Sequence, residues 1–140
     1  MTTARAHVEA ARRLLAHESA GSSAEECAAA AVRVYEKLSR RLAPLIGNVG
    51  VQALFARSAK LSARDFPCLG RLFVDSVTPE AQLQACLGAL EPAAATDAAA
   101  AMVGTFLGLL TAFIGEPIVW QVLEGTFPAT DLKVPKEAKS

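Results

Sequence analysis

The stretch that decides the fold is Ala98–Gly115, AAAAMVGTFLGLLTAFIG, which runs for eighteen residues without a charged side chain. This length reaches the lower limit for a helix that spans a membrane. However, the leading alanines, Gly104, Gly108 and two threonines keep its hydropathy modest, and no cluster of Lys or Arg flanks either end. We therefore predict no membrane span. The stretch (about 97–115) is instead expected to be the buried central helix of a soluble all-α bundle.

The two sides of this predicted helix differ in side-chain size. Ala100, Gly104, Gly108 and Ala112 recur every four positions, and small residues at this spacing let another helix approach closely. Large apolar side chains occupy the other side. A helix that is apolar on all sides must be covered on all sides. The candidate residues for an interface or an apolar pocket are therefore Gly104, Phe106, Gly108, Leu110, Phe113, Trp120 and Phe127.

The remaining sequence predicts a single domain over residues 1–128, with five to six helices in total. Turn and capping residues separate the expected helices, which cover residues 3–18, 22–46, 49–64, 79–91, 97–115 and 116–127. Residues 66–77 give no clear assignment. The first helix has a thin apolar stripe, so two alternatives stay open for residues 1–21: they pack on their own domain, or they form a semi-detached helix that reaches a neighbouring subunit. The polar, lysine-rich residues 129–140 are expected to form a flexible tail.

Helix starts and stops carry specific signals. Ser22 or Ser23 can cap the second helix, and Ser22 and Glu25 have the spacing of a capping box. Gly47 is expected to end the second helix in a left-handed conformation. Pro92 is expected to stop the fourth helix, and Thr96-Asp97 to open the fifth.

A faint internal repeat relates two parts of the chain at an offset of 68 residues. LAPLIGN at residues 42–48 matches LTAFIGE at residues 110–116, and Val51 falls on Val119. Each part is then a long helix, an Ile-Gly corner and a shorter helix. Two interpretations stay open: an internal duplication, or two similar units produced by the same capping rules.

Charge excludes some classes of partner. Fourteen basic and fourteen acidic residues give no net charge, so no overall field attracts nucleic acid or an anionic membrane. The distribution is uneven, because no Lys or Arg occurs from Val74 through Leu132, a stretch with seven acidic residues. Either the two halves pair across the fold, or the acidic C-terminal half faces a basic protein partner or another subunit.

The cysteines are expected to be reduced. Cys27, Cys68 and Cys86 are odd in number, widely spaced and without a CxxC pair, which supports neither a disulfide framework nor a zinc site. The N-terminus carries charged residues rather than the apolar core of a signal peptide. We therefore expect three small buried side chains in a cytoplasmic protein.

No arrangement of catalytic residues is evident. His7 and His17 lie on different faces of the first predicted helix, and no metal-ligand spacing or glycine-rich phosphate loop occurs. The adjacent carboxylates Glu25 and Glu26 lie at a helix start, where capping explains them. The sequence therefore predicts a non-enzymatic protein without metal or cofactor.

Two resemblances are visible. Gly50–Arg57, GVQALFAR, looks like the recognition-helix region of tetracycline-repressor-type regulators over eight residues. Cys27–Leu45 departs from that family, because it predicts one long helix rather than two short ones, and we expect no binding of nucleic acid. More broadly, the chain resembles small alanine-rich helical bacterial proteins of unknown function, through Leu45-Ile46-Gly47, Leu54-Phe55-Ala56-Arg57 and Phe127-Pro128.

These observations favour a helical protein–protein interaction or regulatory module. The alternative is a small carrier or regulator that binds an apolar ligand between helices. The pocket of such a carrier would be lined by Phe106, Leu110, Phe113, Trp120 and Cys86. We also expect a homodimer that buries Trp120 and Phe127, because the last two predicted helices carry more apolar surface than one small monomer easily covers and two-fold dimers are the commonest closed assembly. The alternative is a monomer in which these side chains are buried internally.

Overall fold

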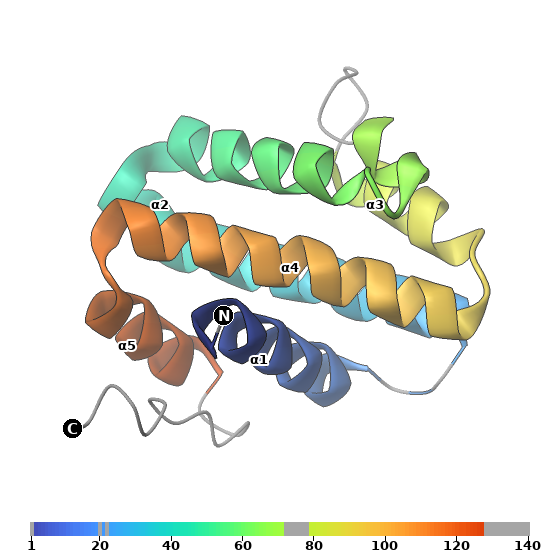
Figure 1. Ribbon diagram of the computed structural model, residues 1–140, viewed down its shortest axis with the longest axis horizontal. Helices are drawn as coiled ribbons and strands as arrows, with labels where there is room; N and C mark the ends of the chain where they lie inside the picture. The colour runs from blue at the N-terminus through green and yellow to red at the C-terminus, as the bar shows by residue number, and fades with distance from the viewer. Residues whose placement is uncertain (1, 20, 22, 72–78, 128–140) are drawn as a thin grey trace.

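The computed structural model describes residues 2–19, 21, 23–71 and 79–127, and its only regular elements there are helices. Their order is α1 (Thr2–Glu18), α2 (Ala24–Ser62), the short 3₁₀ helix η1 (Pro67–Arg71), α3 (Pro79–Gly88), α4 (Pro92–Ile114) and α5 (Glu116–Thr126). The predicted all-α class is confirmed, and the helices form one bundle (Figure 1). The predicted tail (129–140) and residues 72–77 of the unassigned stretch lie outside the described residues.

The corner predicted at Gly47 is present. Gly47 has φ 83° and ψ 155° inside α2, a backbone conformation that side chains other than glycine rarely adopt. The residues before and after it are helical, so α2 is a long first half and a shorter second half that runs back over the bundle (Figure 1). These halves correspond to the second and third helices expected from the sequence.

Two helix starts can be compared with the predictions. Ser23, one of the two serines expected to cap the second helix, caps α2: its hydroxyl accepts a hydrogen bond from the backbone N–H of Glu26 at 3.1 Å. Helix α4 begins at Pro92, several residues before the expected start at Thr96-Asp97. Proline is well tolerated in the first turn of a helix, because its missing N–H would have had no helical partner there. Pro92 therefore starts α4, and it does not stop the preceding helix as expected, because α3 already ends at Gly88.

Helix α4 is the centre of the bundle, as predicted. It packs mainly against α2 and α1, and its buried residues run from Ala95 to Leu110. Among the described residues it is the one helix long and apolar enough to cross a membrane, and half of its most apolar window is buried inside the fold. Its aromatic anchor is Phe106, whose ring stacks on Phe55 of α2 with centroids 3.8 Å apart.

Helix α1 packs on its own domain, which is the first of the two alternatives for this helix rather than the semi-detached one. Its side chains Ala10, Ala11, Leu14 and Leu15 are buried, and α4 is its main neighbour. The small-residue stripe of α4 explains the close contact. A β-carbon placed on Gly104 would lie 3.0 Å from Val8 Cγ2 and 3.1 Å from Val8 Cα. The thin apolar stripe suffices because α4 presents almost no side-chain bulk to it.

The internal repeat is present in three dimensions. Gly47 and Gly115 share one backbone conformation, with φ 83° and ψ 155° at the first and φ 96° and ψ 147° at the second. Both corners lie at the same end of the molecule (Figure 1). Residues 68 apart are buried in pairs: Ala31 and Ala99, Val34 and Met102, Leu38 and Phe106, Leu42 and Leu110, Val51 and Val119, Phe55 and Leu123.

Finer details repeat as well. The Ser58 hydroxyl donates to the Leu54 carbonyl at 2.7 Å, and the Thr126 hydroxyl donates to the Val122 carbonyl at 2.6 Å, again 68 residues apart. The short helices are exchanged between the units, since α1 packs mainly against α4 while α3 packs mainly against α2. The fold is therefore two helix–corner–helix units side by side. Helix α1 precedes the first unit but covers the second, and α3 precedes the second unit but covers the first.

Candidate interaction site

Most of the predicted site residues lie in the core. Phe106, Leu110, Trp120 and Phe127 are buried, Gly104 is covered by α1, and Gly108 is half-buried beside His7. Phe113 differs, because 65% of its surface is exposed. The structure therefore does not bring the seven residues together on one surface. An apolar helix offers no sequence signal that tells its covered side chains from its uncovered ones.

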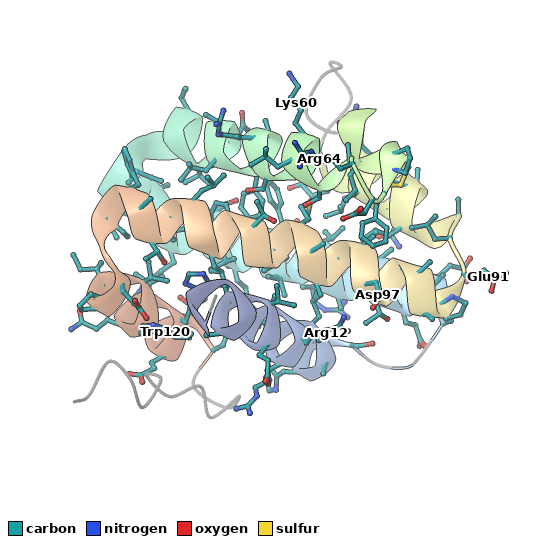
Figure 2. All side chains as sticks on the ribbon, in the orientation of Figure 1. Arg12, Lys60, Arg64, Glu91, Asp97 and Trp120 are labelled. Carbon is teal, nitrogen blue, oxygen red and sulfur yellow. A yellow bond between two sulfur atoms is a disulfide. The ribbon has the colours of Figure 1, made fainter. Side chains whose placement is uncertain are left out.

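Trp120 and Phe127 are buried within one chain, which removes the basis on which we expected them at a dimer contact. The Trp120 ring stacks on His7 of α1 with centroids 6.2 Å apart, and its Nε1–H donates to Glu116 Oε2 at 3.1 Å. In Figure 2 Trp120 lies where α5 meets α1. His7 Nε2 lies 3.1 Å from Thr111 Oγ1, and burial lowers the pKa of His7, partly opposed by the charge of Glu116. These contacts join α1, α4 and α5.

Exposed apolar residues lie at the two corners, where Phe113 is joined by Leu45, Val49 and Ile118, which the sequence did not single out. We define the corner face as Leu45 and Val49 at the first corner together with Phe113 and Ile118 at the second. Their exposed fractions are 57%, 82%, 65% and 44%. Only Leu61 is a further exposed large apolar side chain among the described residues. Apolar exposure is therefore concentrated at the end of the molecule where both corners lie (Figure 1).

A groove adjoins the corner face between the first half of α2 and α5. Its volume is about 470 Å³, and Leu45 and Ile118 belong to both the groove and the corner face. The lining residues are Arg40, Arg41, Pro44, Leu45, Ile118, Gln121 and Val122. Arg40 and Arg41 are exposed, and within the described residues neither forms an ion pair. The groove thus combines apolar walls with two cations that have no carboxylate partner among the residues that the structure describes.

The position of Arg41 depends on a glycine of α5. A β-carbon on Gly125 would lie 2.9 Å from Arg41 Nη2, so the guanidinium rests directly against the α5 backbone. Any other residue at position 125 would push the guanidinium away. The spacing between residues 41 and 125 carries no sequence signal for this contact.

Ion pairs within the chain use few of the charges. In the described residues, Arg12 pairs with Asp97 at 2.9 Å, while Arg33 and Lys37 both pair with Glu18. Only the first of these joins the basic and acidic halves, and it lies on the surface where α1 meets α4 (Figure 2). Among the described residues, one ion pair therefore joins the basic and acidic halves.

The cysteine expectation is wrong for two of the three residues. Cys68 of η1 and Cys86 of α3 form a disulfide, with their Cα atoms 5.9 Å apart. The disulfide removes the support that reduced cysteines gave to a cytoplasmic location. Cys27 is free and buried, and burial raises the pKa of its thiol. A raised pKa reduces the thiolate fraction, so Cys27 is a packing residue.

Two hollows on the described surface do not coincide with the predicted apolar pocket. The groove at α5 is one, and a second of about 390 Å³ lies where α1 meets α2, lined by Arg12, Leu15, Ala16, Ser19, Gly21, Cys27, Ala30 and Thr96. Neither is lined by Phe106, Leu110, Phe113 or Trp120. Within the described part of the chain, no group of three His, Cys, Asp or Glu residues is placed to hold a metal ion.

Comparisons of the chain with protein-family models, with curated proteins and with solved structures find no match. The resemblance to small alanine-rich bacterial proteins thus stays a prediction.

Proposed function

We propose that the chain is a non-enzymatic interaction module that self-associates through the corner face. The observation that carries this proposal is the concentration of exposed Leu45, Val49, Phe113 and Ile118 at one end of a fold whose other large apolar side chains are nearly all covered. Water contact with such side chains is unfavourable, and burying one completely contributes about 1.5–3 kcal/mol. A surface of this kind is typical of a protein–protein contact.

A second copy of the chain is the partner that suits this face best. Two-fold assemblies need one patch that is complementary to itself. The corner face contains equivalent positions from both repeat units, since Leu45 and Phe113 are 68 residues apart and equally uncovered. The same end of the molecule also carries both signs of charge: Arg40 and Arg41 on α2, and Glu116 and Glu124 on α5. A face with these properties can be complementary to the same face of a second copy, in both apolar contact and charge.

Light scattering or sedimentation at micromolar concentration tests the proposal. We expect a mass near twice the 14.6 kDa of the chain. Phe113→Ser should weaken association at least tenfold, because it removes an exposed aromatic ring without opening the core. Leu61→Ser is the matched control: Leu61 is 43% exposed but lies outside the corner face, so this variant should associate like the parent. A monomeric parent protein, or equal effects of the two variants, would overturn the proposal.

A further inference from the structure

The groove beside the corner face has apolar walls and a positively charged rim, which favour a partner surface of matching chemistry. Its walls include the apolar side chains of Pro44, Leu45, Ile118 and Val122. At its rim, Arg40 and Arg41 add two positive charges without an ion-pair partner in the described residues. Potentials across an interface tend to be complementary, so the surface that docks here should be apolar and acidic.

Helix α5 of a second copy has those properties. Its exposed residues are Pro117, Ile118, Gln121, Glu124 and Gly125, and the half-exposed Glu116 begins it. Neither Lys nor Arg occurs in α5. The exposed carboxylate of Glu124 forms no ion pair within the described part of the chain. The acidic helix and the basic groove lie next to each other, so a two-fold axis beside them brings each helix to the partner's groove.

We propose that α5 of one copy docks in the groove of the other, reciprocally, with its carboxylates facing Arg40 and Arg41. This inference rests on the proposed self-association and names the contact that sets its specificity. Ile118 and Leu45 then contribute to both parts of the interface, the apolar corner face and the groove with its two arginines. The Arg41 guanidinium already rests against Gly125, which holds one of the two cations at the groove.

Charge exchange between copies tests the contact. Arg40→Glu/Arg41→Glu should self-associate at least about tenfold more weakly than the parent, because like charges then face each other. Glu124→Lys and Glu116→Lys, made separately, should weaken it in the same way. In a mixture, the glutamates of Arg40→Glu/Arg41→Glu face the introduced lysine of the Glu124→Lys or Glu116→Lys copy. The arginines of that copy face the unchanged carboxylates of the first, so both reciprocal contacts regain opposite charges. The mixture should therefore form a heterodimer with near-parental affinity.

Two controls keep the result interpretable. Arg57→Glu/Lys60→Glu reverses two exposed cations on the second half of α2, where Lys60 projects away from α5 (Figure 2), and should not weaken association. Glu116→Lys also removes the acceptor for Trp120 Nε1–H, so Trp120 fluorescence and circular dichroism must match the parent. If Glu116→Lys fails to fold, Glu116→Gln keeps an oxygen for that hydrogen bond while removing the charge.

The outcomes separate this inference from the proposed function. Restored association in a mixture with either lysine variant supports the docking of α5 in the groove. A dimeric parent whose association survives Arg40→Glu/Arg41→Glu unchanged overturns the contact but leaves the corner face intact. Loss of association that neither mixture restores also overturns it. A parent that is monomeric overturns the self-association itself.

Discussion

The two repeat units share a backbone but differ in how they are covered. Each is a long helix, a glycine corner with positive φ and a shorter helix. Glu36 and Gln52 are exposed in the first unit, whereas the equivalent Gly104 and Trp120 are buried in the second. The covering helices explain this difference. Helix α1, with 17 residues, lies over α4, while α3, with 10 residues, lies over α2.

The difference teaches that the neighbour, rather than the backbone, decides the residue at a position. A glycine is needed at position 104 because Val8 approaches it, and no helix makes the same demand on Glu36. Trp120 has His7 to stack on. One backbone thus accommodates a charged outer surface in the first unit and a covered apolar surface in the second.

The largest expected effect contrasts the covered and uncovered parts of α4. Phe106→Ala should lower the free energy of unfolding by about 3–5 kcal/mol, because it opens a cavity under Phe55. Phe113→Ala, seven residues later on the same helix but 65% exposed, should change it by less than about 0.5 kcal/mol. Urea titrations at low protein concentration measure both. Similar losses in the two variants would contradict the assignment of Phe113 to the surface.

The next effect concerns the shorter covering helix. The Cys68–Cys86 disulfide ties α3 to η1, whereas the longer α1 has no such link. Cys68→Ser/Cys86→Ser should cost about 3 kcal/mol, since the bond closes a loop of 18 residues. Hydrogen exchange should accelerate more in α3 than in α1. A thiol reductant should lower the stability of the parent by the same amount and have no effect on the double variant. Faster hydrogen exchange confined to α1 would contradict a disulfide that stabilises α3.

A smaller effect tests the close approach of α1 to α4. Gly104→Val should destabilise the fold by about 1–3 kcal/mol, because its side chain must displace the backbone of Val8. The control is Glu36→Val at the equivalent position of the first unit, where the side chain is exposed and the cost should stay below about 1 kcal/mol. Thermal unfolding followed by circular dichroism compares them. Equal costs would mean that the two units are covered alike.

Features of the fold that depend on local residue chemistry could be predicted from the sequence. The Ile-Gly corners follow from a residue that tolerates positive φ at the end of an apolar stripe. The central position of α4 follows from the uncharged stretch that begins at Ala98, and the close approach of α1 follows from the glycine spacing. Pro92 was ambiguous, because proline marks both the end of one helix and the first turn of the next.

The candidate site depends on contacts between distant residues, and most of it could not be predicted. Periodicity on an all-apolar helix does not tell that Phe106 is covered and Phe113 is not. Nor does a spacing of 18 residues show that Cys68 and Cys86 meet. The groove joins Arg41 to residues about eighty positions later, and only the fold brings them together. The charge asymmetry was the one sequence signal that pointed toward it.

The smallest expected effect lies where α1 meets the second unit, at His7. Burial lowers the pKa of His7 below its ordinary 6.5, so the unfolded chain takes up a proton at a higher pH than the folded chain does. The free energy of unfolding should therefore fall as pH decreases below about 6.5, and the His7 contribution should be fully present above that value. Urea midpoints at pH 7.5, 6.5 and 5.5 measure this slope. His7→Gln should flatten it, whereas His17→Gln, at an exposed position of the same helix, should keep the parental slope. An unchanged slope in His7→Gln would mean that other groups carry the pH dependence and that His7 accepts its proton without loosening α1 from Thr111 and Trp120.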